Sequence, residues 1–227
     1  MRIFITGGTR GIGRAMALYF TEKGYKVAVC SRKGGLEGVL SLNGDVGDYA
    51  DCKGLFEEVI LQFGGLDVLI NNAGLSHVGY FADTNPEVWH ELINTNLGGV
   101  INCSHLAVRQ MLGQGYGQII NISSIWGRVG ASCEAVYSAT KGGVDTFTKA
   151  LAKEVGGAGI TVNAIACGVV ETEMNNFLDP DEKADLTSEI PLKRFAKPEE
   201  IAQAVDFLVN SGYINGQIIT LDGGLTI

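Results

Sequence analysis

Short apolar runs separated by helix-like segments recur along this chain, and this alternation is the feature that most constrains its fold. Parallel strands need a long crossover between them, which a helix supplies. The alternation therefore predicts an α/β fold, with one parallel sheet covered by helices on both faces. Ligands of such sheets bind at the carboxyl ends of the strands. The apolar runs span residues 2–6, 26–30, 66–71, 118–123, 161–166 and 217–221.

Length and composition favour one compact domain over residues 1–227, because 46% hydrophobic residues suffice for a sizeable core. The net charge is −8 and no basic stripe is present, so no nucleic-acid partner is expected. No apolar run approaches the roughly 18 residues of a membrane span, so we expect a cytoplasmic protein without a membrane partner. Five cysteines without a CxxC pair indicate neither a disulfide framework nor a metal site.

A glycine loop follows the first predicted strand and leads into a helical stretch from Arg14. Such a loop at a helix N-terminus offers N–H groups and a positive dipole end to a pyrophosphate, and the strand-turn-helix context suits that function. The alternative is an ordinary tight turn. The predicted phosphate-binding residues are Gly7, Gly8, Thr9, Arg10, Gly11, Ile12 and Gly13.

The residues after the second predicted strand indicate which dinucleotide the loop would take. NAD-binding βαβ units usually place an Asp or Glu about 20 residues beyond the loop, where it binds the adenosine ribose. This chain has Cys30, Ser31 and Arg32 there, so no carboxylate repels a 2′-phosphate. Arg32 and Arg10 would bind that phosphate through charge-assisted hydrogen bonds, which favours NADP(H) over NAD(H). The alternative is that both arginines are solvated loop charges.

Three polar residues outline a site for reducing a ketone. Tyr137 and Lys141 are four residues apart, a spacing that places them on one helix face, where an ammonium lowers the pKa of a phenol. Ser124, thirteen residues before Tyr137, offers a hydroxyl to a developing oxyanion. Strand alternation points Ser124 and its neighbour Ser123 to opposite faces, so only one of them can face the site. Taken alone, the Tyr and Lys also fit an ordinary exposed helix pair.

The motifs and their order resemble the short-chain dehydrogenases/reductases along the whole chain. This resemblance implies a single-domain Rossmann fold, with a doubly wound parallel sheet of about seven strands. The motifs that carry it are the TGxxxGIG loop at 6–13, the pair at 45–46, NNAG at 71–74, Asn96, Ser124, the YxxxK pair Tyr137 and Lys141, VVET at 169–172 and the segment 216–224.

Catalytic and cofactor-binding roles are implied by the same resemblance. Tyr137 would protonate the alkoxide that forms as hydride leaves the nicotinamide, Ser124 would hydrogen-bond that oxygen, and Lys141 would also hold the nicotinamide ribose. Asn96 would position a water that links Lys141 to solvent; alternatively, it only bends its helix beside two glycines. Besides the loop and residues 31–32, the implied cofactor contacts are Asp45, Val46, Asn72, Ala73, Gly74, Tyr137, Lys141, Val170 and Thr172.

The chain departs from the family pattern at two places. Only twelve residues separate Arg32 from Asp45, so the crossover helix there should be shortened or lost. Cys167 stands where the family usually has Pro, and we expect an unreactive, packed thiol. Residues 174–195 are predicted to form a mobile flap over the site, with a capping box at Asp179 and Glu182, although a plain surface excursion is the alternative. Pro198 should open the next helix.

Two later segments resemble the 3-oxoacyl-[acyl-carrier-protein] reductases of fatty-acid synthesis, namely 190–200 and 213–217. They imply reduction of a 3-oxoacyl thioester. Two features argue against a carrier-protein substrate. Such reductases commonly have basic side chains at places where this chain has Ala158 and residues 113–117. A protein with a net charge of −8 also attracts an acidic partner poorly. Reduction of another ketone, or oxidation of an alcohol, polyol or hydroxysteroid, stays open.

A non-catalytic dinucleotide-sensing protein is the alternative from a different functional class. All four candidate catalytic positions are filled, which favours an enzyme. The resemblance further implies a homotetramer, with a dimer as the alternative, paired through the helices that hold residues 96–111 and 137–155 and through the last strand.

Overall fold

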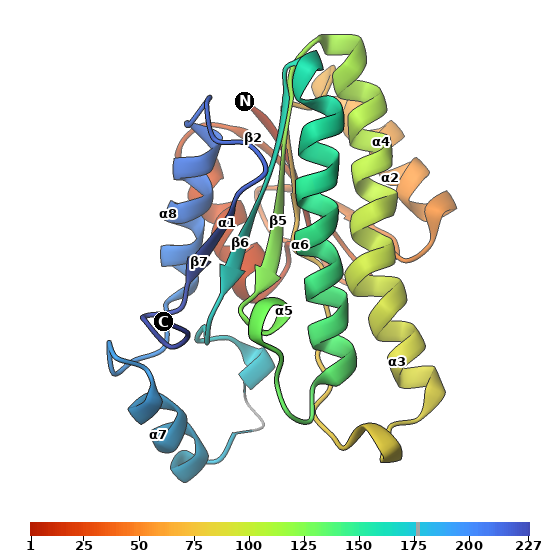
Figure 1. Ribbon diagram of the computed structural model, residues 1–227. Coiled ribbons are helices and arrows are strands. Elements are labelled where there is room, and N and C mark those ends of the chain that lie inside the picture. Colours follow the sequence, from red (N-terminus) through yellow and green to blue (C-terminus); the bar gives the residue numbers. More distant parts are fainter. Residues whose placement is uncertain (176–177) are drawn as a thin grey trace.

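The computed structural model describes residues 1–175 and 178–227, and its strands form one parallel sheet (Figure 1). The strand order is β3-β2-β1-β4-β5-β6-β7, and every neighbouring pair is parallel. The predicted doubly wound sheet is thus confirmed, with the order reversing between β1 and β4. The strands are β1 Arg2–Thr6, β2 Lys26–Ser31, β3 Leu40–Asn43, β4 Val68–Asn71, β5 Gly117–Ser124, β6 Ile160–Cys167 and β7 Ile218–Leu221.

Helices cover both faces of the sheet. In Figure 1, α1 and α8 lie on one side, and α2, α4 and α6 lie on the other. The main helices are α1 Gly11–Glu22, α2 Tyr49–Phe63, α3 Pro86–Ile93, α4 Gly99–Gln114, α5 Trp126–Val129, α6 Ala135–Val155, α7 Pro180–Glu189 and α8 Pro198–Val209. Short helical turns are η1 Phe81–Asp83, η2 Asn94–Gly98, η3 Gly156–Ala158 and η4 Glu173–Asn175.

Alternate residues of each central strand enter two separate cores. Ile3 and Ile5 of β1 pack with Phe20 of α1 and Val205 of α8, whereas Phe4 packs with Phe56 of α2. Phe4 and Phe56 meet edge to face, with ring centroids 5.2 Å apart. A strand buried on both faces needs apolar side chains at successive positions, which explains the continuous apolar runs in the sequence.

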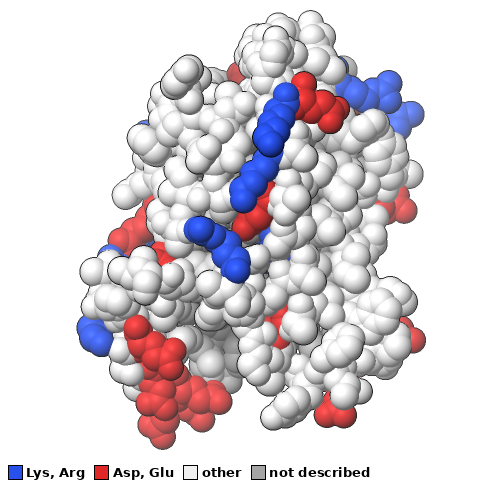
Figure 2. Space-filling view, in the orientation of Figure 1, with Lys and Arg blue, Asp and Glu red and all other residues white. Residues whose placement is uncertain are grey.

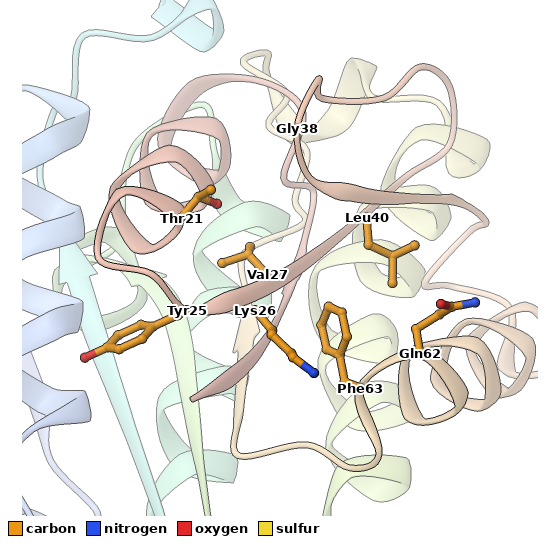
Figure 3. A pocket seen from close by; sticks show the side chains of 8 residues that line it. All are labelled: Thr21, Tyr25, Lys26, Val27, Gly38, Leu40, Gln62 and Phe63. Atoms are coloured by element: carbon orange, nitrogen blue, oxygen red, sulfur yellow. The ribbon is translucent and has the colours of Figure 1, made fainter.

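The connection between β2 and β3 confirms the predicted loss of a crossover helix. Residues 32–39, all described, contain no helix, and β3 pairs with β2 only from Ala28 onward. Lys26 and Val27 therefore lack a β3 partner, and a groove of about 320 Å³ opens beside them. Figure 3 shows Val27, Leu40 and Phe63 around this groove. It lies at the amino end of β2, opposite the end where a ligand is expected.

The segment predicted as a flap carries the predicted helix. Asp179 and Glu182 form the capping box of α7, and α8 begins at Pro198 as expected. Asn176 and Phe177, which fall within the predicted flap, lie outside the described residues. In Figure 1, α7 extends beyond the carboxyl ends of β5, β6 and β7, so the segment lies on the side where the site is expected.

Candidate active site

The carboxyl ends of the central strands bring together residues that are distant in sequence. Thr6 ends β1, Asn71 ends β4 and Ser124 ends β5. Ser124 lies directly opposite Cys167, the last residue of β6. Because parallel strands end at the same edge, these residues frame a single site at the topological switch point.

Tyr137 and Lys141 both lie on α6, which confirms the predicted helix pair. The Lys141 Nζ is 5.6 Å from the centroid of the Tyr137 ring. Lys141 is only 6% exposed, and its Nζ donates a hydrogen bond to the Ile122 carbonyl at 2.9 Å. The pair is therefore not an ordinary exposed helix contact, since a lysine is rarely buried without a function or an acidic partner.

Burial shifts the pKa values of this pair in opposite directions. It raises the pKa of Tyr137 above its ordinary value, and the Ser124 hydroxyl opposes that shift only in part. It lowers the pKa of Lys141 from 10.5 to about 8. The prediction that Lys141 lowers the pKa of Tyr137 is therefore wrong for this structure, because desolvation dominates. A phenol that stays neutral at neutral pH is suited to donate a proton.

The two adjacent serines point to different partners. The Ser124 hydroxyl interacts with the Tyr137 phenol and accepts a hydrogen bond from the Trp126 backbone N–H at 3.2 Å. The Ser123 hydroxyl instead donates to the Lys141 carbonyl at 3.4 Å and interacts with the Asp145 carboxyl group. Strand alternation thus places Ser124, and not Ser123, beside the phenol.

Asn96 lies in a π-helical turn, Asn94–Gly98, that joins α3 to α4. It is fully buried, with Oδ1 accepting from the Leu75 N–H and Nδ2 donating to the Leu75 carbonyl, each at 2.8 Å. A Cβ on Gly74 would lie 3.4 Å from the Asn96 Oδ1 and 3.7 Å from the Lys141 Nζ. Asn96 therefore holds the loop after β4 beside Lys141, and π-helical turns recur at functional sites.

Close backbone approach accounts for the glycines after β1. Gly7 has φ +66°, and a Cβ there would lie 2.9 Å from the Ala73 Cα. At Gly13 a Cβ would lie only 2.2 Å from the Gly7 carbonyl oxygen. The helix α1 begins at Gly11, and its N-cap residue, Arg10, makes no side-chain capping bond. No side chain therefore caps the first turn of α1, so its backbone N–H groups stay available to bind a pyrophosphate.

Asn72 ties the glycine loop to the end of β4. Its Nδ2 donates to the carbonyls of Thr6 and Gly7 at 2.9 and 3.0 Å, and its backbone N–H donates to the Thr6 hydroxyl at 3.0 Å. Asn72 therefore shapes the cofactor loop through its side chain. Of the other loop residues, Gly8 backs onto Val29 of β2, Ile12 packs against the core and Thr9 is half-buried.

The remaining predicted cofactor residues surround this loop at greater distance. Val170 is buried, and the Thr172 Cγ2 would lie 3.4 Å from a Cβ on Gly11, so the segment after β6 returns to the loop. Val46 is also buried. The Asp45 Oδ1 accepts from the Gly47 N–H at 2.8 Å, a contact that closes the turn after β3.

The predicted 2′-phosphate residues lie at the end of β2. The Ser31 hydroxyl donates to the Lys33 carbonyl at 2.8 Å. The Arg32 Nη1 lies 2.7 Å from the Glu91 Oε1 of α3, and both side chains are about half exposed. Arg10 is exposed at the start of α1. The structure thus places the Glu91 carboxylate beside Arg32, a contact that was not predicted from the sequence.

These residues fit a nicotinamide dinucleotide, since the glycine loop and the first turn of α1 would hold its pyrophosphate and Lys141 would hold its nicotinamide ribose. Glycine lets the loop fold tightly against the start of α1 and the end of β4, because a Cβ at Gly7 or Gly13 would collide with the backbone, and Gly74 borders Asn96 and Lys141. Next to this loop the site offers a neutral phenol, a serine hydroxyl and a lysine. This set can protonate an oxygen, hydrogen-bond it as its charge develops, and hold a ribose.

Two residues near the site were missed from sequence. Glu134, the N-cap of α6, is half-buried; burial raises the pKa of its carboxyl group, and its charge raises that of Tyr137. Its spacing of three residues from Tyr137 could have indicated this contact. Glu91 had no local signal, because its partner Arg32 is 59 residues away.

Across residues 1–175 and 178–227, no helix has the length and apolar character needed to cross a membrane. Within the same ranges, no group of three or more His, Cys, Asp or Glu side chains is close enough to bind a metal. All five cysteines are free thiols, and burial raises the pKa of Cys167 to about 12, which leaves it protonated at neutral pH.

Comparison with known proteins assigns the family. The profile of the family described as short chain dehydrogenase matches residues 1–183. A 3-oxoacyl-[acyl-carrier-protein] reductase of Staphylococcus aureus is 41% identical over 236 residues, covering 97% of this chain and 96% of that protein. The protein of the same name from Thermotoga maritima is 39% identical over 239 residues, covering 98% of this chain and 96% of that protein. The chain is therefore a member of the short-chain dehydrogenase family of oxidoreductases.

Proposed function

We propose that this enzyme reduces the 3-oxo group of a 3-oxoacyl thioester to a secondary alcohol, reversibly, with NADPH as the reductant. The observation that carries the proposal is the half-buried Tyr137, which lies beside the buried Ser124 and Lys141 at the carboxyl ends of the strands. The similarity to 3-oxoacyl-[acyl-carrier-protein] reductases over nearly the whole chain supports the choice of substrate.

Each side chain has one task in the proposed reaction. When bound, the nicotinamide supplies a hydride to the substrate carbonyl carbon. Tyr137 donates its phenolic proton to the carbonyl oxygen: the phenol is protonated at neutral pH, and the alkoxide that forms is a stronger base than the phenolate. Ser124 hydrogen-bonds the same oxygen as negative charge develops on it. Lys141 holds the nicotinamide ribose, and Asn96 keeps the neighbouring loop in position for it.

NADPH is proposed over NADH because the end of β2 offers Arg32 and no carboxylate of its own. Ser31, Arg32 and Arg10 would surround the 2′-phosphate. The glycine loop, with residues 72–74 and 170–172, would line the rest of the dinucleotide. The tight fold of the loop supports this placement, because it sets the first turn of α1, which has no side-chain cap, at the carboxyl ends of β1 and β4.

Charge argues for a small thioester over an acidic carrier protein. The net charge is −8, and α7 carries Asp181, Glu182, Asp185 and Glu189 against a single lysine. In Figure 2, acidic side chains gather at the lower left, where Figure 1 places α7, beside the carboxyl ends of the strands. An acidic partner approaching there meets like charge, which slows association.

Steady-state NADPH consumption with matched substrates tests this proposal. We expect turnover of a neutral 3-oxoacyl pantetheine thioester, with kcat/KM for the same acyl group on an acidic carrier protein no higher than for the small thioester. Polyols and hydroxysteroids serve as comparison substrates and should give at most a few per cent of that rate with NADP⁺. Turnover confined to one of those alcohols would refute the thioester substrate, and a gain of several hundredfold on the carrier would refute the steering argument.

We also propose that the protein is cytoplasmic and assembles as a homotetramer. Five free cysteines suit a reducing compartment. Ile101 and Leu112 are large apolar residues exposed on α4, which suits burial against another copy. Light scattering after size-exclusion chromatography should give about four times the chain mass of 24.1 kDa. A single species at the mass of one chain would contradict the assembly.

A further inference from the structure

The ion pair between Arg32 and Glu91 joins two parts of the chain that are distant in sequence. Arg32 follows β2 directly, and Glu91 lies in the second turn of α3. The Nη1 to Oε1 distance is 2.7 Å, and the side chains are 52% and 53% exposed. Neither residue supports a core, so the pair has little structural purpose. Its position instead coincides with the place proposed for the cofactor 2′-phosphate.

We propose that Glu91 is a specificity-determining residue that weakens the preference of this enzyme for the phosphorylated dinucleotide. The inference rests on the NADP(H) assignment proposed above. A phosphate and a carboxylate compete for the same guanidinium, since both are bound by its planar fork of donors. To bind the 2′-phosphate, Arg32 must give up Glu91 or hold two anions that repel each other. A dinucleotide without that phosphate meets neither penalty.

Glu91 differs from the carboxylate that usually selects NAD in such folds. That carboxylate stands at the end of β2 and binds the ribose itself; here the end of β2 is Cys30, Ser31 and Arg32. Glu91 comes from α3 and acts through its hold on Arg32. Its effect should be modest, because an exposed ion pair is weak and easily exchanged. The enzyme should therefore bind NADPH more tightly than NADH, but by a narrower margin than Arg32 alone would give.

Calorimetric titration of the full-length protein with NADPH and with NADH, at one fixed ionic strength, tests the inference without requiring turnover. Glu91→Gln should lower the Kd for NADPH by roughly two- to fivefold, the scale of one exposed ion pair, and change the Kd for NADH by less than about twofold. Glu87→Gln is the matched control, because Glu87 is also exposed on α3 and its loss removes the same charge. It should leave both constants nearly unchanged.

Arg32→Ala separates failure of this inference from failure of the proposed cofactor assignment. Arg32→Ala alone should weaken NADPH binding. In the double variant Arg32→Ala/Glu91→Gln, the second substitution should change the Kd for NADPH no more than Glu87→Gln does. If Arg32→Ala weakens NADPH binding but Glu91→Gln leaves it unchanged or weakens it, Glu91 has no such role and the assignment stands. If Arg32→Ala leaves NADPH binding unchanged, the phosphate contact and the role of Glu91 are both refuted.

Discussion

Tyr137→Phe should lower kcat for 3-oxoacyl thioester reduction by roughly 100- to 10,000-fold, the range typical for loss of a general acid. The substitution removes one hydroxyl and keeps the ring, so the packing at the start of α6 should persist. The raised pKa of Tyr137 means that the wild-type phenol carries its proton throughout the neutral range. Steady-state kinetics measures the loss, and calorimetric titration should show unchanged NADPH affinity.

Tyr213→Phe provides the matched control, since Tyr213 is fully exposed and lies between α8 and β7. It should retain wild-type kinetics within about twofold, as surface substitutions usually do. A Tyr137→Phe variant that kept more than a tenth of wild-type kcat would show that another group delivers the proton. Loss of NADPH binding together with activity would point to a role for Tyr137 in binding instead of proton transfer.

Lys141→Met should abolish most activity and yet make the protein more stable at neutral pH. Burial lowers the pKa of Lys141 from 10.5 to about 8, so the folded protein at pH 7 holds a charge that its environment disfavours. Replacing it with an apolar side chain of similar length should raise the free energy of unfolding by roughly 1–3 kcal/mol, while kcat falls at least about 100-fold. Chemical denaturation and steady-state kinetics measure the two effects.

The pH dependence of this stability gain has a definite sign. Below about pH 8 the wild-type lysine is charged in both the folded and unfolded states, so its burial penalty is fully present. Between about pH 8 and 10.5 the folded protein loses that proton before the unfolded chain does, and the penalty disappears. The advantage of Lys141→Met should therefore shrink as the pH rises through this window.

Lys153→Met is the control on the same helix, because Lys153 is exposed in the last turn of α6. It should leave activity unchanged and lower stability by no more than about 1 kcal/mol, the value of a cation near a helix C-terminus. If Lys141→Met were strongly destabilised at pH 7, the ammonium would have to be better solvated or paired than the structure shows.

The sequence predicted the sheet and most of the site because both depend on local patterns. Continuous apolar runs reveal strands that are buried on both faces, and the run at 2–6 matches β1 at both ends. The spacing of Tyr137 and Lys141 places them on one helix face, and the pair of Asp179 and Glu182 marks the start of α7. The short distance from Arg32 to Asp45 left no room for a crossover helix.

Local sequence patterns could not predict properties that depend on burial or on partners distant in sequence. Spacing indicated that Lys141 would lower the pKa of Tyr137, but desolvation of the phenol raises that pKa, and the group that lowers it in part is the Ser124 hydroxyl. Asn72 was expected to contact the cofactor, and its side chain holds the glycine loop through Thr6 and Gly7. The contact between Arg32 and Glu91 joins residues that are 59 positions apart, so no local pattern indicates it.

The most direct test of the proposed function follows NADPH and product together in one reaction with a 3-oxoacyl thioester and the wild-type enzyme. We expect saturable consumption of NADPH, with one 3-hydroxyacyl thioester formed for each NADPH oxidised. The proposed chemistry requires this equivalence, because one hydride from NADPH and one proton reduce one carbonyl group. NADPH that binds tightly but is not consumed with any 3-oxoacyl thioester would contradict the proposed reaction.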